Sequence, residues 1–266
     1  PGQGWNQLFG SGTGILGSGI TVRGKSGFLQ SLTVQGAVIA EGADTTITLS
    51  SVTNAGSLSA TGGASLAFAS STNNASKTIA VASGGTLRLT GGWGNNGTIN
   101  AAAGSTVELG GSFTKIGTLN RTGATVDFSG DYDLAGTPLT FTAATGNWNW
   151  KGGTIRNTTL SFSGAALVPV AGFGGSLDNV TLASNLSIPA SSSISVSNTL
   201  TLSGANRTIT LNGDPSVGGS NIFSSGTIGG TGTILFAGND VPGQGWNQLF
   251  GSGTGILGSG ITVRGK

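Results

Sequence analysis

The sequence predicts an all-β fold, a right-handed parallel β-helix (β-solenoid) with about 20 residues per coil. Three observations predict it: short segments recur in the same order, apolar residues alternate with Thr, Ser and Asn, and 51 of 266 residues are glycine. Apolar residues at alternate positions suit short strands with one buried face, and Gly-rich stretches suit the corners between them. No segment has the periodicity of an amphipathic helix.

The two ends of the chain carry the same sequence: residues 1–25 and 242–266 are identical. Surface positions of solenoid coils tolerate wide variation, so shared structure alone does not produce such identity. We infer a tandem duplication with a period of 241 residues, in which 1–241 is one solenoid unit and 242–266 begins the next. Residues 223–238 also resemble residues 9–24, so the junction between units is expected to be continuing coil.

The stretch from Ile20 to Ser50 contains short alternating runs that are expected to form the first coils, and a clearer register follows from residue 56. Alternate strand residues face opposite ways, so one set of side chains is expected to point inward. This predicted inward column contains Leu66, Phe68, Leu87, Leu89, Val107, Leu109, Val126 and Phe128. The matching outward column contains Ala67, Arg88, Glu108 and Asp127, in which Arg88 can pair with Glu108.

After residue 139 the spacing drifts, and Pro169 and Pro189 are expected at corners or strand ends, because proline cannot donate to a central ladder. A second regular run starts at residues 179–182 and is expected to return at 198–202. The segment 186–188 is expected to return at 208–210. Within the predicted unit, Gly-x-aromatic triplets align Trp93, Phe113 and Tyr132, with Trp148 as a shortened fourth member.

The coil from Gly97 to Phe113 and the stretch from Asn147 to Leu160 resemble repeats of known β-solenoids. They are similar to repeats of large bacterial surface proteins, the filamentous-haemagglutinin-like and autotransporter-passenger-like adhesins. The resemblance covers most of residues 45–240. It implies a secreted, cell-surface or filament-forming protein built as a right-handed β-helix.

Composition excludes several other classes. The net charge is +2, with eleven basic residues scattered along the chain, whereas nucleic-acid binding needs clustered Lys and Arg. The chain has no cysteine or histidine, and no apolar run approaches the roughly 20 residues of a membrane span. We therefore expect no cofactor, no nucleic-acid partner and no membrane span. The missing initial Met and signal peptide predict a segment of a longer protein.

Some β-helical proteins cleave polysaccharides with paired carboxylates, so the acidic residues are candidates for this chemistry. Glu108, Asp127, Asp131 and Asp133 fall in two consecutive predicted coils, and Asp131 and Asp133 could also hold a cation. The structural alternative is that they are solvated charges that discourage lateral aggregation of strands. Because no His or Cys is present for acid-base or nucleophilic work, we expect no enzyme and no catalytic or metal-binding residue.

The aromatic residues have two interpretations. Trp148, Trp150, Trp93 and Tyr132 are candidates for contact with a glycan, Trp148 and Trp150 foremost because they share one strand face. Equally, stacked aromatic rings commonly fill a solenoid interior or corner. Asn100 and Asn120 align as a short amide ladder, which is more often structural than functional. Thr-x-Thr pairs could indicate an ice-binding surface, which needs a regular array of threonines over many coils. Here the pairs are few and do not align from coil to coil.

Together these features favour a structural extracellular or cell-surface protein. We expect a tandem β-solenoid that forms a stiff surface fibre, an adhesin stalk or a filament of an extracellular or biofilm matrix. Its expected partner is itself, end to end through successive units, with lateral bundling and surface glycans as further candidates. The alternative is a carbohydrate-binding or carbohydrate-cleaving β-helix.

Overall fold

The computed structural model describes residues 6–238, 246–253 and 255–265. The first five residues of the first copy of the 25-mer and the first four of the second copy therefore lie outside the described residues. In the described part of the chain every regular element is a β-strand, and parallel strands stack into a β-solenoid of about 11 turns with roughly 21 residues each. The predicted all-β solenoid class is confirmed. The described residues contain no helix with the length and apolar character of a membrane-crossing segment.

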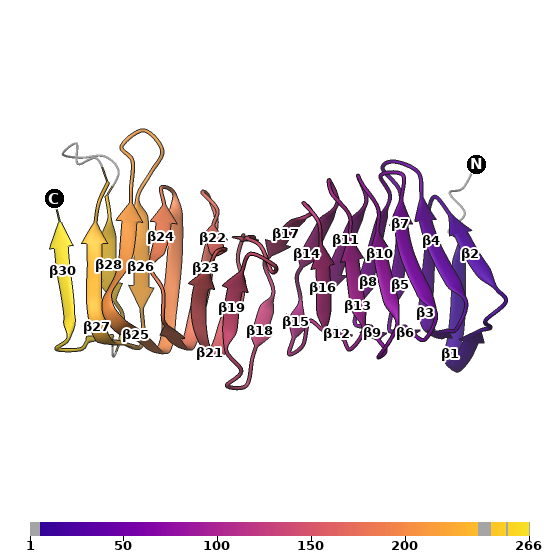
Figure 1. The fold of residues 1–266 in the computed structure, drawn as a ribbon, viewed down its shortest axis with the longest axis horizontal. Coiled ribbons are helices and arrows are strands. Elements are labelled where there is room, and N and C mark those ends of the chain that lie inside the picture. Colours follow the sequence, from indigo (N-terminus) through magenta and orange to yellow (C-terminus); the bar gives the residue numbers. More distant parts are fainter. Residues whose placement is uncertain (1–5, 239–245, 254, 266) are drawn as a thin grey trace. The chain divides into compact units, whose positions relative to one another are not determined.

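The chain divides into two compact units, residues 1–130 and 131–266, which are described in turn (Figure 1). The strands of the first unit are β1 (Gln7–Leu16), β2 (Thr21–Gly24), β3 (Gly27–Val34), β4 (Ala37–Glu41), β5 (Thr46–Ser50), β6 (Thr53–Asn54), β7 (Ser57–Thr61), β8 (Ser65–Ala69), β9 (Thr72–Asn73), β10 (Thr78–Val81), β11 (Thr86–Thr90), β12 (Gly94–Asn95), β13 (Thr98–Ala101), β14 (Thr106–Leu109), β15 (Ser112–Phe113), β16 (Thr118–Arg121) and β17 (Thr125–Phe128).

Most strands of the first unit pair in parallel with a strand one turn further along the chain. One run of neighbours is β3-β5-β8-β11-β14-β17, a second is β3-β6-β9-β12, and a third is β2-β4-β7-β10-β13-β16. The long strand β3 contributes to two runs because its first half pairs with β5 and its second half pairs with β6. Each turn therefore supplies three short strands, one to each face of the solenoid.

The interior of this unit is filled by the side chains at alternate strand positions. Leu66, Leu87, Val107 and Val126 are register neighbours in successive turns, and each is at most 1% exposed. All eight residues of the predicted inward column are buried. Removing such a side chain from water contributes about 1.5–3 kcal/mol per position. On the outer side of the same strands, Arg88 forms an ion pair with Glu108 at 3.2 Å.

A row of asparagine amides is buried at one corner of the first unit. The Asn54 Nδ2 group donates to Asn73 Oδ1, and Asn73 Nδ2 donates to Asn95 Oδ1, both at 2.7 Å. The row ends where Asn95 Nδ2 donates to the carbonyl of Ile116 at 2.6 Å. All three side chains are at most 1% exposed, so their amides cannot bond to water. The bonds within the row supply hydrogen-bond partners to amide groups that would otherwise have none.

The second unit uses longer strands. They are β18 (Asp131–Asp133), β19 (Leu139–Thr142), β20 (Trp148–Trp150), β21 (Thr154–Ser163), β22 (Leu167–Pro169), β23 (Gly174–Leu182), β24 (Leu186–Pro189), β25 (Ser192–Asn212), β26 (Ser220–Ser224), β27 (Thr227–Phe236), β28 (Gln248–Gly251), β29 (Ile256–Leu257) and β30 (Ile261–Gly265). Strands β21, β23, β25 and β27 each bend around a corner and so contribute to more than one face.

The second unit corrects two details of the predicted register. Leu186 pairs with Ile209, one residue beyond the predicted return at 208, which sets one buried aliphatic side chain against another. Tyr132 pairs with Ile155, whereas Trp148 lies on β20 and pairs with Leu167. Trp148 is therefore not the fourth member of the aromatic series, because the glycines that suggested it recur at many corners.

Candidate functional site

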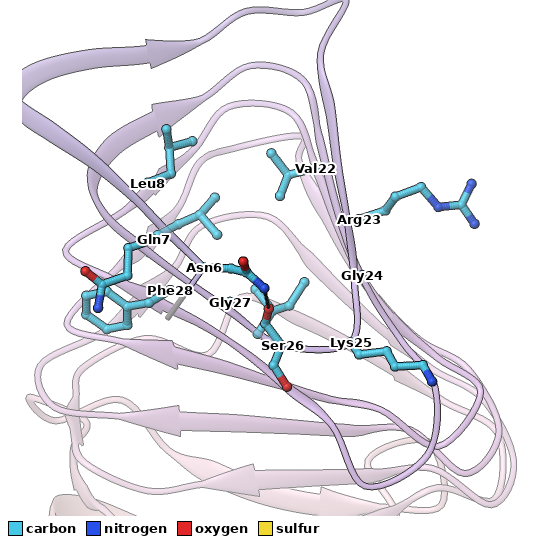
Figure 2. A pocket seen from close by; sticks show the side chains of 12 residues that line it. Asn6, Gln7, Leu8, Val22, Arg23, Gly24, Lys25, Ser26, Gly27 and Phe28 are labelled. Atoms are coloured by element: carbon cyan, nitrogen blue, oxygen red, sulfur yellow. Dashed lines mark hydrogen bonds between the residues drawn. The ribbon is translucent and has the colours of Figure 1, made fainter. Parts of the chain in front are cut away.

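The most distinctive sites on the described chain are the two ends of the solenoid. At the N-terminal end, the first coil leaves the interior open as a cavity of about 390 Å³. Figure 2 shows the cavity, with Asn6 inside the turn and joined to Ser26, and with Arg23 and Lys25 pointing away. Leu8 and Val22 line it together with Leu29 and Ile47 of the following turns. Leu8 is 40% exposed, so a core position is open to solvent at this end.

At the C-terminal end, the second copy of the same coil is also left uncovered. Its strands β28, β29 and β30 pair with β26 and β27 on one side only. Leu257 is 45% exposed and Val263 is 41% exposed, although the counterpart of Leu257 in the first copy, Leu16, is only 7% exposed.

The two copies of the coil show its two sides. The N-terminal copy pairs forward, with Leu8 against Leu29, Leu16 against Val34 and Val22 against Val38. The C-terminal copy pairs backward, with the equivalent positions against Ile222, Ile228 and Ile234. All six of these neighbours are buried aliphatic residues. The duplicated coil thus continues three apolar columns in both directions.

The polar partners of the coil differ between the copies in the same way. Asn6 Nδ2 donates forward to the Ser26 carbonyl at 3.4 Å, and Asn247 Oδ1 accepts backward from the Gly213 amide at 2.7 Å. Asn247 Nδ2 is buried and, among the described residues, has no hydrogen-bond partner. An unpaired buried amide costs about 1–3 kcal/mol.

Charge follows the same pattern. Arg23 of the first copy forms an ion pair with Glu41 at 2.8 Å, and this hydrogen bond lowers the pKa of the Glu41 carboxyl. The equivalent Arg264 forms no ion pair with any described residue. The position next to Arg264 that a following coil would occupy is thus also one for an acidic side chain.

Backbone hydrogen bonds join each copy of the coil to its neighbouring turn. The N–H groups of Phe28, Gln35 and Ala37 donate to carbonyls of the first copy, at 2.9, 2.8 and 3.0 Å. In the second copy, the N–H groups of Ser252, Ile256 and Gly258 donate to the preceding coil, at 2.8, 3.0 and 2.9 Å. Donation also runs the other way, because the Gly232 N–H donates to the Gly260 carbonyl of the second copy at 3.2 Å. The strands of the coil therefore carry both donors and acceptors toward a neighbouring turn, and unpaired groups of this kind form a template for another strand.

The aromatic residues considered for glycan contact are all in the interior. Trp93, Tyr132, Trp148 and Trp150 are between 2% and 7% exposed. Trp93 stacks on Phe113 with ring centroids 4.2 Å apart, and its Nε1 donates to the Gly110 carbonyl at 2.6 Å. Burial raises the pKa of the Tyr132 hydroxyl. These positions support the interpretation of the rings as interior packing.

The acidic residues of the second unit are tied to basic and amide groups. Arg156 lies 3.7 Å from both Asp131 and Asp178, which belong to the preceding and following turns. Asp133 Oδ1 accepts hydrogen bonds from the Asn157 side chain at 2.9 Å and the Ala135 amide at 3.0 Å, and these bonds lower the pKa of the Asp133 carboxyl. Among the described residues no group of three potential ligands could hold a metal ion. Glu108 and Asp127 are register neighbours in the first unit.

The Asp133 hydrogen bonds predict a weak acid sensitivity. The pKa of Asp133 in the folded chain is below its unfolded value of about 4, so its stabilisation is present above that pH and is lost as the pH falls through the folded pKa. In Asp133→Asn the side-chain oxygen still accepts from Asn157 but does not titrate. Because Asp133 is exposed to solvent, we expect the variant to reduce the loss of stability in acid by less than about 1 kcal/mol. Urea unfolding midpoints measured across the acid range, with Asp44→Asn as the control, test this.

A second hollow, of about 400 Å³, lies over β7, β10, β13 and β16. It is lined by small Ser, Thr, Ala and Asn side chains, including Asn100 and Asn120, whose amides are joined at 2.9 Å. The lining has no ionisable residue.

Comparison with protein-family models, with curated proteins and with solved structures finds no match to this chain. The sequence had indicated the end coils through the identity of residues 1–25 and 242–266, but it did not indicate what their side chains do. The roles of Asn6, Asn247 and Arg264 emerge only when the neighbours of the two copies are compared.

Proposed function

We propose that this chain is a structural repeat of a tandem β-solenoid, which serves as a stiff extracellular or cell-surface filament. One observation carries the proposal: the duplicated coil has compatible neighbours on both sides, so one unit can follow another without a break in the ladder. In such an array the coil of residues 6–24 lies between a preceding coil of residues 213–236 and a following coil of residues 26–41. Every inward column then runs from buried aliphatic to buried aliphatic residue.

A mechanical role fits the chemistry of the described residues. Hydrogen bonds between neighbouring turns run parallel to the solenoid axis. Stretching the solenoid therefore strains many hydrogen bonds at once and also pulls apart the packed side chains of the interior. Arg156 forms ion pairs with Asp131 and Asp178, and Trp93, Trp148 and Trp150 are buried. These features support a role in shape and spacing rather than in chemistry.

The mass of the native polypeptide under denaturing conditions tests the proposal. We expect a mass well above the 25.9 kDa of this chain, in steps of one 241-residue period. A native mass near that of a single period would contradict a tandem array.

Chains with one, two and four complete periods, each followed by residues 242–266, provide a second measurement. At roughly 21 residues per turn, and with strands about 4.8 Å apart, one period is expected to add about 55 Å of contour length in electron micrographs. A control with the same number of units separated by flexible Gly-Ser linkers should give beads with variable spacing. Equal behaviour of the two series would contradict a continuous ladder.

A further inference from the structure

We propose that the outer face of the second unit around Trp246 binds a neutral glycan, whose sugar rings pack on exposed aromatic side chains. The site lies on the side of the solenoid, over the first part of β25 and over β26 and β28 (Figure 1). The ligand class is an uncharged oligosaccharide or polysaccharide. The inference goes beyond the proposed filament role and does not depend on it, because one chain contains all three strands.

Three aromatic side chains are exposed together on this face. Trp246 is 64% exposed, Phe250 is 45% exposed and Phe223 is 41% exposed. Phe223 and Phe250 are register neighbours in successive turns, and their rings are nearly parallel, at 7°, with centroids 5.3 Å apart. Trp246 lies two residues before Gln248, the first residue of β28, and so shares the outward side of that strand. Clustered exposed aromatic residues mark a binding surface.

The exposure of these rings does not come from the end of the chain. Phe223 is exposed although turns lie on both sides of it, with Ser195 as its register neighbour before and Phe250 after. Phe250 has its preceding turn in place, the equivalent Phe9 has its following turn, and both rings face outward. In the proposed tandem array, a following unit covers the open interior and adds the ring of Phe28 beside Phe9, but it leaves this outer face uncovered.

Amide and hydroxyl groups surround the rings. Gln248 is the register neighbour of Asn221, and Asn221 is the register neighbour of Ser193. Ser195 lies beside Phe223 in the same way. A sugar ring presents an apolar C–H face and an edge of hydroxyl groups. Aromatic rings bordered by hydrogen-bonding side chains match both parts of such a ligand.

Asn221 also carries an unused acceptor. Its Oδ1 atom is buried and has no hydrogen-bond partner among the described residues. An unpaired buried polar atom costs about 1–3 kcal/mol. The amide group has a broad rotational preference about its last side-chain bond, so rotation can turn Oδ1 outward. A sugar hydroxyl group on this face then supplies the donor that the described chain does not.

The charge of the face selects the class of partner. Its described outward positions hold Ser, Asn, Gln, Phe and Trp, none of which ionises. An acidic polysaccharide or a nucleic acid would need basic side chains here, so the electrostatic complement is a neutral molecule. A second copy of the chain is the competing occupant, because aromatic residues also lie at the centre of protein interfaces. The unpaired acceptor and the border of hydroxyl and amide groups favour a ligand rich in O–H donors.

The test is binding of the full chain to a microarray of neutral and acidic oligosaccharides that includes cellohexaose, maltohexaose and laminarihexaose. Calorimetric titration with the neutral oligosaccharide that gives the strongest signal then measures the affinity. We expect binding to neutral oligosaccharides, with an affinity that is the same at low and high salt because no ion pair forms. Trp246→Ala and Phe223→Ser should each weaken binding about tenfold or more, because each removes an aromatic ring that packs on the sugar.

Two further variants separate binding from folding. Ile256→Ser removes an apolar side chain that is 56% exposed on β29, outside this face, and should bind like wild type. Asn221→Ala removes the unpaired acceptor, so it should weaken binding several-fold without lowering the urea midpoint of unfolding. Thermal unfolding of all variants checks that the chains remain folded.

Three results would overturn the inference. The first is a wild-type chain that binds no neutral oligosaccharide on the microarray. The second is glycan binding that Trp246→Ala and Phe223→Ser leave unchanged. The third is self-association in sedimentation velocity that both variants abolish while glycan binding persists, which would assign the face to a second copy of the chain. None of these results bears on the tandem array, which the mass of the native polypeptide tests separately.

Discussion

Replacing Leu87 with aspartate is expected to unfold the turns around β11 and to lower the free energy of unfolding by about 4 kcal/mol or more. The Leu87 side chain is fully buried, and its register neighbours Leu66 and Val107 are fully buried as well. An aspartate there would have no counter-charge among these neighbours and would also remove the packing of the leucine. Urea unfolding followed by far-ultraviolet circular dichroism measures the loss.

Ala67→Asp is the matched control for this substitution. Ala67 lies on the outward side of β8, and its register neighbour in the next turn is Arg88. The same charge at this position meets water and a guanidinium group, so the expected change is within about 1 kcal/mol and is stabilising in sign. Comparable destabilisation by the two substitutions would show that the assignment of inward and outward faces is wrong.

Replacing Asn73 with alanine is expected to cost about 3 kcal/mol or more. Asn73 is the middle of the buried amide row, and its removal orphans Asn54 Nδ2 on one side and takes a donor from Asn95 on the other. It also leaves a small void in a packed corner. The measurement is the shift in the denaturation midpoint at constant slope.

Asn120→Ala supplies the comparison for Asn73→Ala. Asn120 donates to Asn100 in a pair of the same chemistry, but both side chains are exposed. Water replaces the lost bond, and the expected change is within about 0.5 kcal/mol. If both asparagines proved equally costly or equally neutral, burial of the row would not be what makes it stabilising.

Much of the first unit could be predicted because its coils are nearly equal in length. The alignment of Leu66, Leu87, Val107 and Val126 needs only a period near twenty and alternation along each strand, and the structure places all four in register. The pairing of Arg88 with Glu108 follows from the same alignment.

The second unit was harder because its corners vary in length. Ile194 pairs with Ile222, 28 residues on, since the loop containing Asp214 and Gly218 lengthens that turn. Short motifs such as Gly-x-aromatic then mislead, as they did for Trp148, because they mark corners in general rather than one corner in particular. Only the pairing of strands distinguishes the corners.

The end coils could be located from the sequence but not interpreted from it. Identity of two segments says that their structures are equivalent, and it says nothing about which groups each one leaves unpaired. In the sequence Asn247 resembles any surface asparagine. In the structure its Nδ2 is buried with no partner among the described residues, whereas Asn6 Nδ2 donates to the Ser26 carbonyl. The difference between the two asparagines depends on which residues surround each one, and sequence periodicity does not reveal those surroundings.

Because the duplicated coil fits both of its neighbours, whole periods can be gained or lost by recombination without disturbing the fold. In a tandem array, loss or gain of a whole 241-residue period by recombination between the identical segments regenerates the same joint each time. No new interface has to be selected, and no interior column is interrupted. In the proposed tandem array, length can therefore change by whole units while the fold of every unit stays the same.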